Sequence, residues 1–153
     1  MPKLAILLGS KSDKSYAESA EIYLKYFGIE YEINIMSAHR NPALVTEFAT
    51  NAREKGYSAI IAGAGMAAHL AGVVAAHTDL PVLGVPLPGG VMDGLDALLS
   101  TVQMPAGVPV ATFAVGKAGM RNAVVFAAQI FALSEPGILE SLKEFREKGS
   151  RLD

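Results

Sequence analysis

The sequence places a histidine directly before an arginine, at His39 and Arg40, within residues 37–42 (Ser-Ala-His-Arg-Asn-Pro). An imidazole exchanges a proton near neutral pH, whereas a guanidinium stays charged and binds phosphate through two parallel hydrogen bonds. The segment begins where an alternating apolar stretch ends and an amphipathic helical one starts, so we predict a loop. We interpret His39 as a proton carrier and Arg40 as the anchor of a substrate.

A second candidate segment, residues 9–13 (Gly-Ser-Lys-Ser-Asp), follows a short apolar run and precedes a helical pattern. Its glycine lets the backbone approach a ligand, and its serine hydroxyls and free helix-terminal amides suit a phosphate. Asp13 can accept hydrogen bonds from ribose hydroxyls. Ser12 or Asp13 can instead serve only to cap the helix.

A third candidate segment, residues 63–68 (Gly-Ala-Gly-Met-Ala-Ala), matches the loose dinucleotide-binding pattern. It follows the third predicted strand instead of the first, and no acidic residue ends the next strand to hold a ribose. A nicotinamide enzyme is therefore disfavoured. The glycines at Gly63 and Gly65 indicate a turn whose backbone amides face a carboxylate or a phosphate.

The two remaining histidines receive different interpretations. His77 ends a predicted helix, where side-chain donors find carbonyl partners, so we expect a structural role. His69 lies about one turn into the helix after the glycine segment and is either a ligand-facing residue or a hydrogen-bonded core residue. The sequence has no Cys, and no carboxylate or third histidine stands at ligand spacing from His39 or His69, so we expect no metal site.

Strands and helices that alternate regularly must position these three segments. We predict strands at residues 3–8, 31–36, 58–62, 81–85 and 108–115, and helices at residues 14–27, 42–55, 67–77, 93–101, 119–133 and 136–148. This alternation of strands and helices predicts an α/β protein with a flavodoxin-like three-layer fold. We expect a five-stranded parallel sheet of order 2-1-3-4-5 and an additional C-terminal helix. In that order the three segments meet at the carboxyl ends of neighbouring strands.

Composition limits the organisation and the partners. The chain has 153 residues, 51% of them hydrophobic, which fits a single domain at 1–153. The net charge is -2, whereas a surface that binds nucleic acid or an anionic membrane needs clustered Lys and Arg. A small molecule is therefore the expected partner. The absence of Cys and of a secretory signal favours a cytoplasmic location.

One predicted helix has no polar face. Residues 123–133 are apolar nearly all round, whereas a helix that faces water should expose polar residues. We expect another copy of the chain to cover the apolar surface of this helix. We therefore predict a homo-oligomer whose interface includes this helix and can extend to residues 67–76.

Five sequence blocks closely resemble, in the same order, the phosphoribosylaminoimidazole carboxylase (PurE) family in its class of N5-carboxyaminoimidazole ribonucleotide mutases of de novo purine synthesis. The blocks are residues 9–13, 37–42, 63–70, 94–100 and 102–110. The resemblance extends from Leu4 to about Leu133. The family commonly has glycine where this chain has Met66 and proline where it has Ala71, so these two residues depart from the resemblance. The Met66 side chain can narrow the substrate pocket, or it can point away from it.

The resemblance implies a ribonucleotide substrate whose carboxyl group moves from an exocyclic nitrogen to ring carbon C4, with no cofactor and no metal, in a homo-octamer. His39 matches the histidine that moves the proton, Arg40 is expected at the phosphate, and His69 is expected near the carboxyl group. Residues 67–76 and 86–90 are candidate walls of the pocket. The positions expected to bind substrate are Gly9, Ser10, Ser12, Asp13, Ser37, Arg40, Gly63, Gly65, Ala67, His69 and Leu70.

Two alternatives remain open. A sister class of the family carboxylates aminoimidazole ribonucleotide directly with carbon dioxide. From a different class, a flavodoxin-like nucleotide-binding or flavin-binding module would use the first loop for phosphate, but the sequence has no Trp to stack on a flavin ring.

Overall fold

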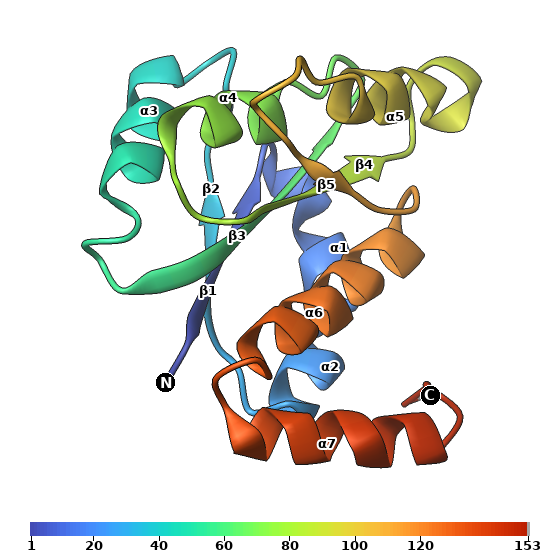
Figure 1. Ribbon diagram of the computed structural model, residues 1–153. Helices are drawn as coiled ribbons and strands as arrows, with labels where there is room; N and C mark the ends of the chain where they lie inside the picture. Colours follow the sequence, from blue (N-terminus) through green and yellow to red (C-terminus); the bar gives the residue numbers. More distant parts are fainter. Residues whose placement is uncertain (153) are drawn as a thin grey trace.

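A five-stranded sheet of order β2-β1-β3-β4-β5 forms the middle layer of the structure, a computed structural model that describes residues 1–152 (Figure 1). All its strand pairs are parallel. The strands are β1 (Lys3–Leu8), β2 (Glu30–Ile35), β3 (Tyr57–Gly65), β4 (Val82–Leu87) and β5 (Ala111–Thr112). The predicted α/β class, the flavodoxin-like layers and the strand order are confirmed.

Helices cover both faces of the sheet (Figure 1). One face packs against α1 (Lys14–Glu18), α2 (Glu21–Tyr26), α6 (Lys117–Phe131) and α7 (Pro136–Glu147). The other face packs against α3 (Pro42–Asn51), α4 (Leu70–His77) and α5 (Leu95–Val102). Two short 3-10 turns, η1 (Lys11–Asp13) and η2 (Val91–Asp93), precede α1 and α5.

The side chains of β1 divide between the two hydrophobic cores. Leu4, Ile6 and Leu8 belong to the core on the α6 side, and Ala5 and Leu7 belong to the core on the α3 side. All five are fully buried. Successive residues of a strand point to opposite faces, so a strand covered on both faces must be apolar throughout. This explains why the uninterrupted apolar run predicted the strand correctly.

Three predicted elements outside residues 57–77 differ clearly from those observed. The helix predicted at residues 14–27 is broken between α1 and α2, where the Ser19 hydroxyl donates to the Tyr16 carbonyl at 2.6 Å and the Ala20 amide bonds three residues back instead of four. The helix predicted at 42–55 ends at Asn51. The strand predicted at 108–115 is only two residues long, and Pro109, which lies before it, has no amide hydrogen to donate to a neighbouring strand.

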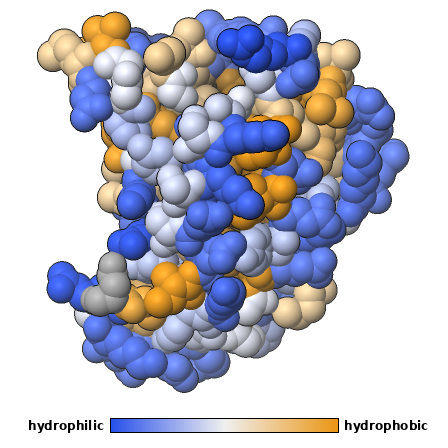
Figure 2. All heavy atoms as spheres, turned by 180° about the vertical axis from the view of Figure 1, so that it is seen from behind, coloured by the Kyte–Doolittle hydropathy of each residue, from blue (hydrophilic) through white to orange (hydrophobic). Residues whose placement is uncertain are grey.

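The apolar helix α6 is covered partly by its own chain. Ala123, Val124, Ala127 and Ala128 are fully buried against α1, α2, α7 and the sheet, whereas Phe126 remains 40% exposed. Exposed apolar side chains also follow one face of α5, at Leu95, Leu99 and Val102. Seen from behind, the surface is mainly hydrophilic, with separate apolar patches (Figure 2). The homo-oligomer therefore stays a prediction.

Tyr57 joins the amino-terminal ends of three strands. Its hydroxyl donates to Glu32, which also accepts a hydrogen bond from Lys3 at 2.5 Å, and the Lys3 ammonium lies 4.8 Å from the centre of the Tyr57 ring. Burial, together with the hydrogen bond to Glu32, raises the pKa of Tyr57 to about 12. The hydrogen bonds from Lys3 and Tyr57 lower the pKa of Glu32.

This arrangement predicts a loss of stability at high pH. Between pH 10 and 12 the unfolded chain ionises Tyr57 while the folded chain keeps it neutral, so the free energy of unfolding should fall by about 1–2 kcal/mol across this window. Tyr57→Phe should abolish that part of the fall, as measured by urea unfolding at pH 8, 10 and 11. Tyr26→Phe is the matched control. An equal pH dependence in Tyr57→Phe and the unmodified chain would contradict the prediction.

Candidate active site

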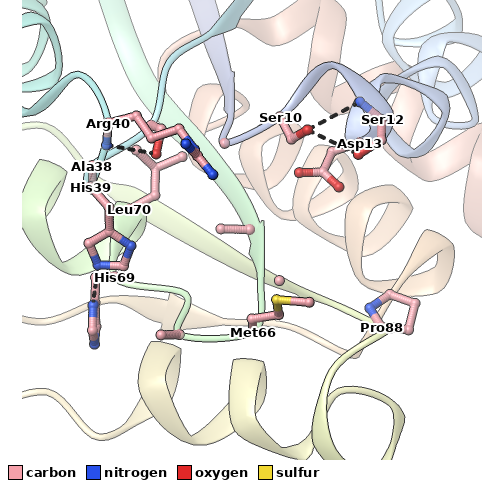
Figure 3. Close-up of a pocket in the computed structure, with 16 residues that line it drawn as sticks. Ser10, Ser12, Asp13, Ala38, His39, Arg40, Met66, His69, Leu70 and Pro88 are labelled. Atoms are coloured by element: carbon pink, nitrogen blue, oxygen red, sulfur yellow. Dashed lines mark hydrogen bonds between the residues drawn. The ribbon is translucent and has the colours of Figure 1, made fainter.

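A pocket of about 540 Å³ lies at the carboxyl ends of β1, β2 and β3 (Figure 3). The residues that line it are Gly9, Ser10, Ser12, Asp13, Ser37, Ala38, His39, Arg40, Ala64, Gly65, Met66, Ala67, His69, Leu70, Pro88 and Gly89. The three segments singled out in the sequence therefore meet in one cavity. Sequence reasoning did not identify Ala38 and Ala64, whose small apolar side chains carry no chemical signal.

The first wall of the pocket is the turn after β1. Ser10, and neither Ser12 nor Asp13, caps η1: its hydroxyl accepts a hydrogen bond from the Ser12 amide at 3.4 Å and lies 3.0 Å from the Ser12 hydroxyl. Asp13 precedes α1 but makes no side-chain capping bond. Burial raises the pKa of the Asp13 carboxyl, and a backbone hydrogen bond from Ser10 partly offsets this effect. Two hydroxyls and a carboxyl thus face the cavity (Figure 3).

The second wall is the turn after β2. The Ser37 hydroxyl accepts the Arg40 amide at 3.2 Å, and the Ser37 carbonyl accepts the Asn41 amide at 2.8 Å. This closed turn holds the side chains of His39 and Arg40 at the cavity. The Arg40 guanidinium points across the pocket towards the side that carries Ser10 (Figure 3). An anion between these two sides can contact both a guanidinium and hydroxyl groups.

His39 and His69 are in direct contact. The His39 Nε2 and His69 Nδ1 atoms lie 2.6 Å apart, and the two rings are nearly perpendicular, with their centres 4.8 Å apart. At this distance one nitrogen must donate a proton and the other accept it, so the pair can pass a proton but cannot carry protons on both facing nitrogens. Within residues 1–152, no cluster of three or more His, Cys, Asp or Glu could hold a metal ion.

The glycine segment differs from the predicted turn. Gly63 and Gly65 lie within β3, which pairs with β1 and β4 as far as those residues. A Cβ at Gly65 would lie 3.4 Å from the Leu87 carbonyl oxygen, which is ordinary van der Waals contact, so the approach of β4 does not by itself require glycine. Gly63 does not line the pocket, because a side chain at this position would point towards Leu8 and Met120 in the core.

The turn starts one residue after the glycines, at Met66. The amides of Ala68 and His69 bond to the carbonyls of Met66 and Ala67, two residues back, at 2.9 and 2.8 Å. These short turns delay the helix, so α4 begins at Leu70 and His69 immediately precedes it instead of lying one turn inside. His77 bonds through Nδ1 to the Val73 carbonyl at 2.8 Å, as expected for a structural histidine.

A serine on α5 fixes this turn from outside the pocket. The Ser100 hydroxyl oxygen accepts the Ala68 amide at 2.9 Å and lies 3.3 Å from the Met66 carbonyl oxygen. Ser100 belongs to the fourth block of the resemblance, but its spacing from residues 66–69 gives no hint of this contact. It positions the loop that carries His69.

The fold and the pocket define an α/β protein with an open site of mixed polar and apolar lining that suits a small molecule. The chain matches the family model described as AIR carboxylase over residues 3–151. It is 49% identical over 147 residues to the N5-carboxyaminoimidazole ribonucleotide mutase of Saccharolobus solfataricus, with coverage of 96% of this chain and 92% of the relative. It is 50% identical over 151 residues to the protein of the same name from Thermotoga maritima, with coverage of 99% and 87%.

A solved structure agrees with these sequence matches. The crystal structure of Treponema denticola PurE has a TM-score of 0.88 and 32% sequence identity, and the alignment covers 98% of this chain and 92% of that one. The chain belongs to the AIR carboxylase family and is an enzyme. No helix within residues 1–152 combines the length and the apolar character needed to cross a membrane.

Ser100→Ala should loosen the turn that carries His69. Removal of the hydroxyl leaves the Ala68 amide without its partner, so we expect the free energy of unfolding to fall by about 1 kcal/mol. Ser141→Ala is the matched control. The Ser141 hydroxyl donates to the Gly137 carbonyl of its own helix, as the Ser100 hydroxyl does to the Asp96 carbonyl, but it does not bond to a loop. Urea unfolding of both variants provides the comparison. Equal stability of the two variants would show that the contact contributes nothing.

Proposed function

We propose that this enzyme is an N5-carboxyaminoimidazole ribonucleotide mutase of de novo purine synthesis. It would move the carboxyl group of its substrate from the exocyclic nitrogen to ring carbon C4, giving 4-carboxy-5-aminoimidazole ribonucleotide. The observation that carries the proposal is that His39 lines the same pocket as Arg40, Ser10 and Ser12, whose side chains suit a phosphate. The names of relatives about 50% identical to the chain support it.

Each wall of the pocket has a proposed role. The Arg40 guanidinium and the Ser10 and Ser12 hydroxyls bind the 5′-phosphate, with Gly9 and Ser37 shaping the turns that present them. Asp13 accepts hydrogen bonds from the ribose hydroxyls. The carboxyl group lies towards Gly65, Ala67, His69 and Leu70. We leave Gly63 out of the proposed contacts because it faces the core.

The reaction needs only one proton carrier. The bond between the exocyclic nitrogen and the carbamate carbon breaks, which releases carbon dioxide and leaves the electron pair on nitrogen. Ring carbon C4 attacks the carbon dioxide to form the new carbon–carbon bond. The proton lost from C4 passes through His39 to the exocyclic nitrogen. Bonds and protons balance without any transfer of electrons to an acceptor, so we propose no cofactor.

The proposed chemistry also requires that carbon dioxide be retained and water excluded. His39 and Arg40 are exposed in the single chain, so association of subunits is the proposed means of closure. The exposed apolar residues Leu95, Leu99 and Val102 on α5, and Phe126 on α6, support a homo-oligomer. We propose the octamer implied by the family resemblance, in a cytoplasmic location.

His39→Asn should abolish turnover while leaving the assembly intact. Asparagine can keep a hydrogen bond near His69 but cannot carry a proton at neutral pH, so we expect kcat/KM to fall at least about a hundredfold. Sedimentation velocity should give the same octamer for the variant and the unmodified chain. His77→Asn is the control and should retain activity, because His77 bonds only to a helix carbonyl. A fully active His39→Asn would remove the proton role.

The choice of substrate tests the reaction itself. The purified protein receives either the carbamate nucleotide or aminoimidazole ribonucleotide with bicarbonate, without ATP, and the carboxylated product is followed. We expect a clear preference for the carbamate. A preference for bicarbonate would assign the chain to the direct carboxylases, a reaction that the family description AIR carboxylase favours. Nucleotide binding without conversion of either substrate would indicate a binding module.

A further inference from the structure

Met66 has a backbone conformation that is unfavourable for its residue type. Its φ angle is +53°, in the left-handed region, where the Cβ of an L-residue crowds the backbone. Within residues 1–152, only three other non-glycine residues have positive φ, and they are Met92, Asp93 and Ser150. A methionine persists in this region only when the surrounding structure imposes it, and such strain concentrates at ligand sites.

The surroundings of Met66 fix its backbone firmly. The residue before it, Gly65, still pairs with Leu87 in the sheet. Its own carbonyl accepts the Ala68 amide at 2.9 Å and lies 3.3 Å from the Ser100 hydroxyl oxygen. The backbone at Met66, and with it the direction of the Cα–Cβ bond, is therefore held by the sheet on one side and by α5 on the other.

This side chain contributes little to the hydrophobic core. Met66 is 64% exposed, and it lines the pocket. The other large apolar residue in the lining, Leu70, is buried. Met66 lies between the side of the pocket formed by His39 and His69 and the side formed by Asp13 and Pro88, and it points towards the latter (Figure 3). Met66 thus contributes an exposed, flexible apolar surface to the pocket.

We propose that Met66 is a binding residue that packs its thioether against the flat heteroaromatic ring of the substrate. Methionine adapts to irregular space, and its sulfur makes favourable contacts with aromatic rings. Arg40 and Ser10 hold the phosphate end, so a contact on the ring face fixes the reacting carbon relative to His39. This inference rests on the proposed function, and it adds a residue that selects for an aromatic ring.

Binding measurements on four variants test the inference. Isothermal titration calorimetry gives the Kd for 4-carboxy-5-aminoimidazole ribonucleotide and for ribose 5-phosphate, which has the sugar and phosphate but no ring. Met66→Gly and Met66→Asn should both weaken binding of the nucleotide about twofold to tenfold, the range that a sulfur–aromatic contact provides. Neither should change binding of ribose 5-phosphate. Asparagine tolerates the left-handed region, so it removes the thioether without loosening the backbone.

Met92 provides the matched control. It also has a left-handed backbone, with φ +49°, and is 79% exposed, but it does not line the pocket. Met92→Gly should relieve strain in the same way, with an unchanged or higher Tm, and should leave the Kd for the nucleotide unchanged. Met66→Leu, which keeps an apolar side chain, should bind the nucleotide more tightly than Met66→Gly.

The outcomes separate this inference from the proposed function. If the unmodified chain does not bind the nucleotide, the proposed function is wrong and the inference falls with it. If it binds but Met66→Gly and Met66→Asn match it, only the role of Met66 is wrong. Weaker binding in Met66→Gly alone would assign the effect to backbone freedom and overturn the contact. An equal loss in Met92→Gly would do the same.

Discussion

The parallel register of β1 with its two neighbours is the constraint on which the pocket depends. At the end of β1, Leu8 lies opposite Ile35 of β2 and Gly63 of β3. The three chain segments therefore approach the same edge of the sheet, and each turns there in its own way. A shift of register would move the turn carrying His39 away from the turn carrying His69, and their 2.6 Å contact would be lost. The side chains of β1 are fully buried in two different cores, so a shift that exchanged them would leave cavities and overlaps and is disfavoured.

Two of the three turns at this edge are stabilised without the imidazole and guanidinium groups that they carry. Ser37 secures the second turn through its hydroxyl and carbonyl, so the Arg40 guanidinium and the His39 imidazole need not contribute. Ser100 secures the third turn from outside the pocket, which leaves the His69 imidazole to meet His39. Separating the residues that hold the loops from the residues that face the cavity keeps the latter available for substrate.

The sequence predicted the fold more completely than the loops. Strands buried on both faces appear as apolar runs, and their alternation with helices leaves few possible strand orders. Gly63 and Gly65 do not form the predicted turn, because glycine occurs both in turns and inside strands where a neighbour packs closely. Here a Cβ at Gly63 would lie 3.2 Å from the Leu8 side chain. The left-handed conformation at Met66 could not be predicted, since the contact of Met66 with Ser100 and the pairing of Gly65 with Leu87 join residues that are distant in sequence.

Closure of the pocket links the surface to the chemistry. In the proposed reaction the released carbon dioxide would be small and uncharged, so neither Arg40 nor the histidine pair could hold it by charge, and only the walls of the pocket could keep it near C4. The single chain leaves His39, Arg40 and Met66 exposed, while apolar side chains such as Leu99, 48% exposed, remain uncovered on α5. Burial of apolar surface between subunits is favourable by about 25 cal/mol per Å². Association that covers these side chains would thus supply the free energy for enclosing the site, which makes assembly part of the proposed mechanism.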